Sequence, residues 1–214
     1  MKLYGFFRSS AAFRVRIALN LKGLSYEQAP VHLRRNEQFR ADYRAVQPQA
    51  LVPALALDDG EVLIQSLAII EYLEETHPRP PLLPGHPAAR ARVRALALAV
   101  ACDIHPINNL RVLRYVADPL GQDAKGVETW YNHWIKLGFD SIERILAEDG
   151  QAGDFCQGDE PSLADVCLVP QFFNAQRYPS FDLAPYPTIR RIAGNCLKLD
   201  AFQRALPENQ PDAE

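Results

Sequence analysis

A run of prolines divides the chain into two parts with different patterns. Residues 77–87 read HPRPPLLPGHP and contain five prolines. Proline lacks a backbone N–H and fixes φ, so this run excludes both a helix interior and a central strand. The segment is therefore predicted to be a linker, and the chain on each side of it must fold around its own core.

The first part alternates between strand and helix signals. The expected strands are 3–7, 25–33, 53–57 and 62–64, and the expected helices are 11–22, 36–45 and 66–76. Gly23 stands where the first helix should end, and Asp58-Asp59-Gly60 indicates a hairpin turn. This order predicts a mixed four-stranded sheet with helices packed on it.

The second part is predicted to be helical throughout. One long helix is expected over 88–116, bent at Pro106, because proline removes a backbone donor. A second is expected over 123–148, with one core stripe made of Trp130, Trp134, Leu137 and Ser141. A third opens at Ser162, and Asp165 three residues later resembles a capping box with a folding role. The polar tail from Pro207 is expected to be loose.

Composition limits the class of protein. The 214 residues are 48% apolar and 23% charged, with a net charge of −3, so a basic nucleic-acid surface is not indicated. No apolar run approaches membrane-span length, and no signal peptide is expected. The four cysteines are scattered without a C-x-x-C pair, which favours a reducing cytoplasm. The five histidines lack metal-ligand spacing, so no metal site is expected.

The first candidate site is Arg8-Ser9-Ser10, where a short apolar strand runs into a helix. Unpaired backbone N–H groups and two hydroxyls at a helix start attract an anion, and a bound thiolate would be stabilised there. The simpler interpretation is that one serine only caps the helix. No G-x-S-x-G elbow surrounds the serines, so a hydrolase nucleophile is not supported.

Two further candidate sites stand at strand ends. Val52-Pro53 is either an ordinary trans bond or a cis turn whose free Val52 peptide groups pair with a peptide ligand. Gln65-Ser66 begins a helix and is either a cap or a carboxylate site. All three candidate sites occupy comparable positions at the ends of strands, so we expect them to lie together.

Several segments resemble a known family. RSSAAFRVRIALNLKG, LVPAL, IQSLAIIEYLEETHP and PSLADVCLVPQ are similar to the zeta class of glutathione S-transferases, whose bacterial members include maleylacetoacetate isomerases. The resemblance covers nearly the whole chain. It implies a thioredoxin-like domain over 1–81, followed by an all-helical domain over 86–214.

The resemblance also implies a glutathione site. Its residues from the first part are Ser9, Ser10, Ala11, Ala12, Phe13, Arg14, Gln38, Val52, Pro53, Gln65 and Ser66, and from the second part His105, Asn109, Leu110 and Arg111. Ser10 is the expected hydrogen-bond donor to the thiolate, with Ser9 as the alternative. Many relatives carry a cysteine where this chain has Ala11, so the nucleophilic sulfur is expected to come from glutathione.

The implied activity is glutathione-dependent cis–trans isomerisation of maleylacetoacetate to fumarylacetoacetate, in tyrosine and phenylalanine catabolism. The thiolate adds to the double bond, the resulting single bond rotates, and elimination restores glutathione. Arg8 and Arg177 are expected to bind substrate carboxylate. Without the resemblance, packing of Arg8 at the sheet edge and a surface salt bridge of Arg177 would be the simpler roles. A homodimer is also expected, with residues of the helical domain reaching the ligand.

Three alternatives remain. Maleylpyruvate isomerase uses the same chemistry on a shorter substrate; some of its members carry an arginine where this chain has Leu110, which favours maleylacetoacetate. A general zeta-class transferase or dehalogenase shares every site residue. A non-catalytic protein of the same fold is the third alternative, and Arg8, Ser9 and Ser10 together count against it.

Overall fold

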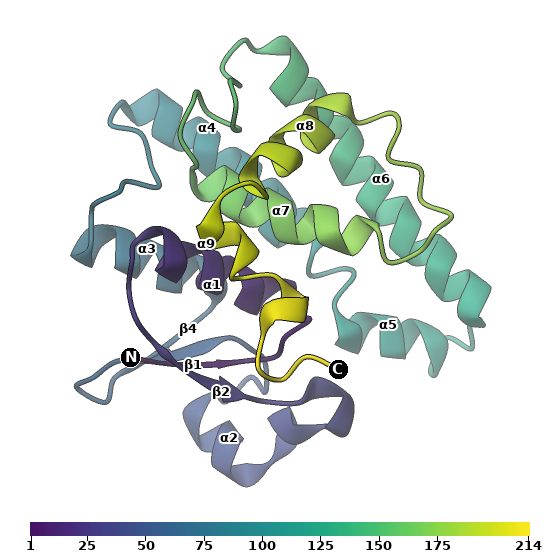
Figure 1. Ribbon diagram of the computed structural model, residues 1–214. Coiled ribbons are helices and arrows are strands. Elements are labelled where there is room, and N and C mark those ends of the chain that lie inside the picture. The colour runs from purple at the N-terminus through teal and green to yellow at the C-terminus, as the bar shows by residue number, and fades with distance from the viewer. The chain divides into compact units, whose positions relative to one another are not determined.

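The computed structural model describes residues 1–214, which divide into two compact units (Figure 1). The first unit consists of Met1–Leu82 together with Leu197–Glu214, and the second of Leu83–Cys196. This division differs from two consecutive domains over 1–81 and 86–214, because the chain returns to the first unit at its end. We call Leu197–Glu214 the C-terminal segment.

A four-stranded mixed sheet forms the centre of the first unit, as predicted. Its strands are β1 (Lys2–Gly5), β2 (Glu27–Pro30), β3 (Ala54–Ala56) and β4 (Val62–Ile64), in the order β2-β1-β3-β4. β1 pairs parallel with β2 and antiparallel with β3, and β3 pairs antiparallel with β4. The β3–β4 hairpin turns at Gly60, whose φ of +92° suits a residue without a Cβ.

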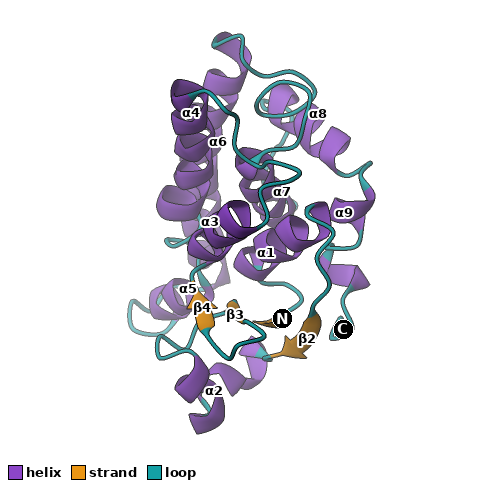
Figure 2. Ribbon diagram, turned by 90° about the vertical axis from the view of Figure 1, so that its left-hand side faces the viewer, coloured by secondary structure: helices purple, strands orange, loops and turns teal.

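Helices cover both faces of this sheet. α1 (Ser10–Leu21) and α3 (Ser66–Thr76) lie on one face, and α2 (Ala41–Val46) lies on the other (Figure 2). α1 is buried along nearly its whole length, since it packs against α3 and against the short α9 (Asp200–Gln203). This burial on several sides makes α1 the core helix of the unit.

The segment expected as one helix over 36–45 is two shorter elements. A 3-10 turn covers Glu37–Phe39, and α2 follows after Arg40. Arg40 has an extended backbone, with φ −64° and ψ 148°, which interrupts the helix between them. A further 3-10 turn, Leu33–Arg35, precedes both.

The C-terminal segment is packed against the first unit, so the expectation of a loose tail from Pro207 was wrong. Pro207 opens a 3-10 turn and is buried, as is Gln210. Gln210 Nε2 donates to the carbonyls of Arg204 at 2.9 Å and Leu206 at 2.6 Å. Its Oε1 accepts from Gln28 Nε2 at 3.1 Å, which ties the segment to β2. The polar composition suggested a solvated tail, but the side-chain amide of Gln210 makes its hydrogen bonds inside the protein.

A buried lysine fixes the start of the linker. The Lys22 side chain is 0% exposed, and its Nζ donates to Glu74 Oε2 at 2.7 Å. It also donates to the carbonyl oxygens of His77 at 2.7 Å and Pro80 at 3.1 Å. Three acceptors match the three donors of the ammonium group, which makes burial of this charge tolerable. Residues 77–86 of the linker contain no helix or strand, as predicted, and Pro87 is the first residue of α4.

The second unit is helical. Its helices are α4 (Pro87–Leu98), α5 (Leu110–Ala117), α6 (Ala124–Glu148), α7 (Leu163–Ala175) and α8 (Pro187–Cys196). α7 is buried from Leu163 to Gln171 and packs against α4 and α8, so it is the central helix.

The single long helix expected over 88–116 is interrupted. After α4 the chain forms a π-helix over Ala99–Ile104 and then turns, and α5 starts after its cap, Asn109. Pro106 lies in this turn and has no N–H to continue a helix. A bend was predicted at this proline, and the structure has a break.

The core stripe of α6 was also assigned to the wrong face. The buried residues are Tyr131, Ile135, Phe139, Ile142 and Leu146. Trp130 and Trp134 are only half-buried, and Leu137 is 54% exposed. Both stripes have helical spacing and differ by about one position, so spacing alone does not decide which one packs.

None of the helices has the length and apolar character needed to cross a membrane. All four cysteines are free thiols, and three of them are buried.

Candidate functional site

Four loops leave the sheet at one edge. Because β1 is parallel to β2 and antiparallel to β3, and β3 is antiparallel to β4, the ends of β1, β2 and β4 lie beside the start of β3. These strand ends carry the loops 6–10, 31–39, 51–53 and 65–66. We call this edge, with its four loops, the site edge. It brings together the predicted site residues of the first part of the chain.

The first loop ends at the start of α1. Ser9 is the N-cap, and its Oγ accepts a hydrogen bond from Ala12 N at 3.2 Å, which confirms that one serine caps the helix. Ser10 is the first helical residue and is buried. Since the first turn contains no acidic residue, the positive end of the helix dipole is not offset locally. Ala11, Ala12 and Phe13 continue this first turn.

A buried arginine connects the starts of two helices. Arg14 is 1% exposed, and its Nη1 donates to Ser66 Oγ at 3.4 Å. Ser66 is the buried first residue of α3. The guanidinium therefore places a positive charge between the two helix starts, where an anionic ligand would be stabilised electrostatically.

Gln65 precedes α3 with an unusual backbone. Its φ is +70°, and its side chain makes no capping hydrogen bond. Its Nε2 instead donates to Gln49 Oε1 at 2.8 Å. Gln65 therefore does not cap α3 with its side chain, which was one of the two interpretations of this pair, and a second glutamine holds its exposed amide.

The Val52–Pro53 bond is cis, as the functional interpretation of this segment required. β3 begins only at Ala54, and neither the N–H nor the C=O of Val52 makes a hydrogen bond within the protein. The preceding residue is fixed, because Tyr43 Oη donates to Leu51 O at 2.6 Å. A peptide unit with both groups free suits pairing with an extended peptide ligand.

Gln38 adds an unsatisfied acceptor. It lies in the loop after β2 and is 5% exposed, and its Oε1 has no hydrogen-bond partner. A buried acceptor without a donor costs about 1–3 kcal/mol, so a ligand N–H that reached it would be stabilising. The free peptide groups of Val52 and the Gln38 acceptor fit the amide groups of glutathione.

The second unit holds the other predicted contacts, at the start of α5. His105 ends the π-helix, and Asn109 caps α5 by accepting from Arg111 N at 3.1 Å. Leu110 is the first residue of that helix. These four residues are therefore clustered within one turn and the helix start that follows it.

The two arginines predicted to bind substrate are both exposed. Arg8 lies in the loop between β1 and α1, next to Ser9. Arg177 follows α7, and its guanidinium lies 5.4 Å from the ring centre of Tyr131 and 5.5 Å from that of Tyr178. Arg177 thus contacts aromatic faces, and the surface salt bridge considered for it is absent.

The predicted capping box is confirmed, and it lies in the second unit. Asp165 is fully buried, and its Oδ2 accepts from the N–H of Ser162 at 2.8 Å and from its hydroxyl at 2.7 Å. Its Oδ1 accepts from Cys156 N at 2.8 Å. Burial raises the pKa of Asp165, although the hydrogen bonds from Cys156 and Ser162 oppose that shift.

Sequence reasoning missed two residues that hold the first loop. Asp212 Oδ2 accepts from Phe7 N at 3.0 Å, and Arg16 Nη2 donates to Phe7 O at 2.9 Å. Burial lowers the pKa of Arg16 to about 10, while Tyr26 and Asp212 oppose the change. Asp212 and Phe7 are separated by 205 residues, so no local pattern could indicate the contact.

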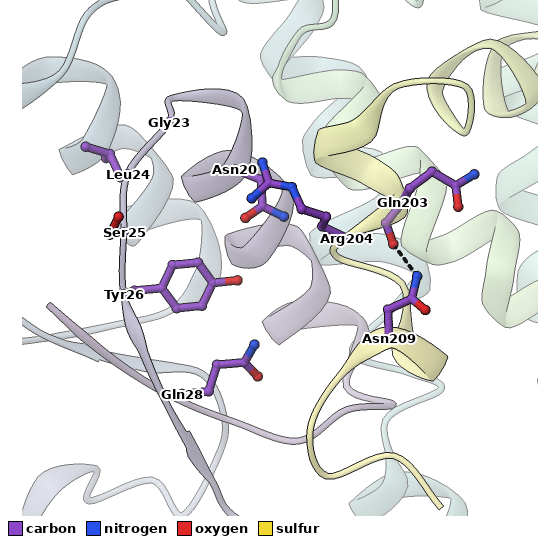
Figure 3. A pocket seen from close by; sticks show the side chains of 9 residues that line it. All are labelled: Asn20, Gly23, Leu24, Ser25, Tyr26, Gln28, Gln203, Arg204 and Asn209. Atoms are coloured by element: carbon purple, nitrogen blue, oxygen red, sulfur yellow. Dashed lines mark hydrogen bonds between the residues drawn. The ribbon is translucent and has the colours of Figure 1, made fainter.

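A separate hollow of about 680 Å³ lies in the first unit, between the end of α1 and the C-terminal segment (Figure 3). It is lined by Asn20, Gly23, Leu24, Ser25, Tyr26, Gln28, Gln203, Arg204 and Asn209. None of these is a predicted site residue. No group of three or more His, Cys, Asp or Glu side chains is arranged to hold a metal ion.

Comparison with known proteins identifies the family of this chain. Residues 3–81 match the family described as glutathione S-transferase, N-terminal domain. The chain is 52% identical to a maleylpyruvate isomerase of Ralstonia, with 100% of each chain covered. It is 47% identical to the maleylacetoacetate isomerase of Pseudomonas aeruginosa, with 99% of this chain and 98% of that protein covered.

Solved structures show the same fold. A holo structure of a maleylpyruvate isomerase, described as a bacterial zeta-class glutathione S-transferase, superposes with a TM-score of 0.97 at 51% identity over all of both chains. The Methylobacterium extorquens maleylacetoacetate isomerase with bound malonate and glutathione gives a TM-score of 0.96 at 44% identity, again over all of both chains. The chain therefore belongs to the zeta class of glutathione S-transferases, the family of the maleylacetoacetate and maleylpyruvate isomerases.

Proposed function

We propose that this protein is a glutathione-dependent isomerase that converts maleylacetoacetate to fumarylacetoacetate, a step in tyrosine and phenylalanine catabolism. The observation that carries the proposal is the site edge, which gathers the Ser9-Ser10 helix start, the cis Val52–Pro53 peptide and the Gln65–Ser66 helix start. Relatives named for this activity at 47% identity over nearly their full length support it.

The first unit supplies the groups that would hold glutathione. The free N–H and C=O of Val52 suit its cysteinyl backbone, and the start of α3 at Ser66 suits its γ-glutamyl carboxylate. Gln65 and Gln38 would add amide contacts. His105, Asn109, Leu110 and Arg111 are proposed to contribute from the helical domain, across a dimer interface.

When bound, glutathione supplies a thiolate that adds reversibly to the cis double bond, so that the bond can rotate before it is restored. Ser10 is proposed to donate its hydroxyl hydrogen to that sulfur, at the positive end of α1. Both interactions favour the charged sulfur and lower the pKa of the thiol. Ala11 offers no competing sulfur at this point.

Arg8 and Arg177 are proposed to bind substrate carboxylate, since a guanidinium binds two oxygens at once. Both side chains are exposed. We expect Arg8→Ala and Arg177→Ala to raise the KM for substrate while the Kd for glutathione stays at the wild-type value. Unchanged turnover of a maleyl substrate in either variant would exclude that arginine from substrate binding.

Maleylpyruvate is the second candidate substrate, because the Ralstonia relative at 52% identity is named for it; a probable maleylacetoacetate isomerase of Vibrio cholerae is equally identical. The apolar Leu110, where some of those enzymes carry arginine, favours maleylacetoacetate. Both compounds should be assayed with and without glutathione. Faster glutathione-dependent turnover of maleylacetoacetate supports the proposal, a preference for maleylpyruvate selects the second candidate, and no turnover of either refutes both. A transferase activity on other electrophiles would be a side activity of the same site.

A homodimer in a reducing cytoplasm is part of the proposal. Leu98 on α4 and Leu137 and Ile145 on α6 are exposed at 43%, 54% and 41%, which suits coverage by a second copy. The four cysteines form no disulfide bond, which agrees with a reducing compartment. Sedimentation analysis should give twice the chain mass of 24.0 kDa, and a monomer would contradict the dimer.

A further inference from the structure

We propose that the C-terminal segment is a strap that positions two loops of the glutathione site, and that Asp212 is its principal positioning residue. The inference rests on the proposed glutathione site at the site edge. The yellow C-terminal segment in Figure 1 runs from α9, beside α1, to the end of β2. Its last residues therefore lie at the site edge.

The first contact holds the loop that leads to Ser9 and Ser10. Phe7 is 5% exposed, and its N–H donates to Asp212 Oδ2 at 3.0 Å. Its C=O accepts from Arg16 Nη2 at 2.9 Å. Both backbone groups of Phe7 are thus fixed by charged side chains immediately before Arg8. Hydrogen bonds to charged groups are about twice as strong as neutral ones, so this residue is firmly placed.

Asp212 also acts through the charge of Arg16. The Arg16 guanidinium is 2% exposed, and its Nε donates to Ala205 O at 3.1 Å, within the C-terminal segment. Burial lowers the pKa of Arg16 to about 10, and Tyr26 and the carboxylate of Asp212 oppose that shift. Arg16 therefore joins the strap to Phe7 from one side, and Asp212 joins it from the other.

The second contact holds the loop that carries Gln38. Glu214 Oε1 lies 2.9 Å from His32 Nε2 and accepts from Arg35 Nη2 at 2.8 Å. His32 Nδ1 accepts from Arg35 N at 3.2 Å, so Nε2 carries the hydrogen and donates it to Glu214. This pairing fixes the start of the loop, and Gln38 follows within it.

The two loops also contact one another. The rings of Phe6 and His32 meet edge to face, with centres 5.0 Å apart. Gln210 fixes the strap just before these contacts through its bonds to Arg204, Leu206 and Gln28. One anchored segment thus reaches both the Ser9-Ser10 loop and the Gln38 loop, and a shift of the strap would move both.

A graded series of variants tests the strap. Asp212→Ala removes the acceptor for Phe7 N–H, and Asp212→Asn retains an acceptor without the charge. Glu208→Ala is the matched control, because Glu208 is an exposed carboxylate of the same segment with no hydrogen bond. We expect the Kd for glutathione, by calorimetry, to rise about tenfold in Asp212→Ala and about threefold in Asp212→Asn, with no change in Glu208→Ala.

Two further readouts separate positioning from general loss of structure. The KM for glutathione should rise in parallel with Kd, while kcat at saturating glutathione changes less. The pKa of the bound thiol, followed by thiolate absorbance, should rise in Asp212→Ala because Ser10 is less well placed. Hydrogen exchange at the Phe7 amide should be faster in that variant and not in the control.

Wild-type glutathione affinity in folded Asp212→Ala would overturn the proposal. If Asp212→Ala does not fold, Asp212→Asn decides the question, and an unchanged Kd in that variant overturns the strap equally. Failure of the proposed function looks different, because wild-type protein itself would then not bind glutathione. The Phe7 exchange measurement would still report on the contact in that case.

Discussion

Each unit uses charged side chains to hold a loop, but the two loops differ in what they carry. In the second unit, Asp165 binds backbone groups three and nine residues away. In the first unit, Asp212 binds Phe7 N across 205 residues of chain. Arg16 binds Phe7 O nearby and also binds Ala205 O, which lies 189 residues further along the chain. The Asp165 loop contains no proposed site residue, whereas Phe7 leads directly to Ser9 and Ser10. Hydrogen bonds from backbone groups to Asp165 thus stabilise the fold of the second unit. The contacts of Asp212 and Arg16 in the first unit position a proposed site loop.

The largest expected effect is the loss of stability when Asp165 is replaced. Asp165→Ala leaves the N–H groups of Ser162 and Cys156 buried without acceptors, at about 1–3 kcal/mol each. We expect the free energy of unfolding to fall by about 4 kcal/mol in urea denaturation. Asp154→Ala is the control, because that aspartate is exposed and its carboxylate makes no hydrogen bond. A decrease in the free energy of unfolding of less than about 1 kcal/mol in Asp165→Ala would contradict a folding role for Asp165.

The next effect separates the two serines of the site. We expect Ser10→Ala to lower kcat/KM about 100-fold, as loss of one donor to a developing or bound anion does, and to raise the pKa of bound glutathione. Ser9→Ala removes the cap on Ala12 N, so it should cost about 1 kcal/mol of stability. If the pKa of the bound thiol moves in Ser9→Ala and not in Ser10→Ala, the two roles are exchanged.

The smallest expected effect is on stability, from replacing the exposed carboxylate of Asp140. The hydrogen bond from Lys136, at 2.6 Å, lowers the pKa of Asp140. The resulting stabilisation is present above the ordinary aspartate pKa and is lost as the pH falls through the lowered value. Asp140→Asn should therefore cost about 0.5 kcal/mol at pH 7 and nothing at the acid end.

Urea denaturation at several pH values measures this difference, with Glu160→Gln as a control because Glu160 is exposed and makes no hydrogen bond. A loss that is the same at every pH would show that the Asp140 charge contributes nothing. The effect would then come from the changed side chain alone.

The sequence predicted those parts of the fold that neighbouring residues in the chain determine. Helix 66–76 was placed at its observed bounds, because a strand end and the linker limit it on either side. The face of α6 was wrong, since Trp134 and Ile135 both belong to stripes with helical spacing and only packing selects between them. The break after Ile104 was missed because a proline signals a bend or an end of a helix equally well.

In the site, too, the features with a local sequence signal were predicted and those that depend on distant contacts were not. Val52-Pro53 and Ser9-Ser10 were recognisable, because a proline at a strand start and a serine at a helix start have local meanings. The free peptide groups of Val52 depend on where the ladder with β1 stops. The hydrogen bond between Phe7 and Asp212 forms because the chain returns to the first unit after the second. The sequence around either residue does not indicate that return.

The return of the chain also sets the order in which the molecule is completed during synthesis. Domains usually fold as they leave the ribosome, the N-terminal one first. Here the first unit needs Leu197–Glu214, which follow every residue of the second unit. Arg16 stays without Ala205, and Phe7 without Asp212, until those two residues have been translated. A ribosome-bound nascent chain should therefore carry a folded helical unit before it carries a finished glutathione site.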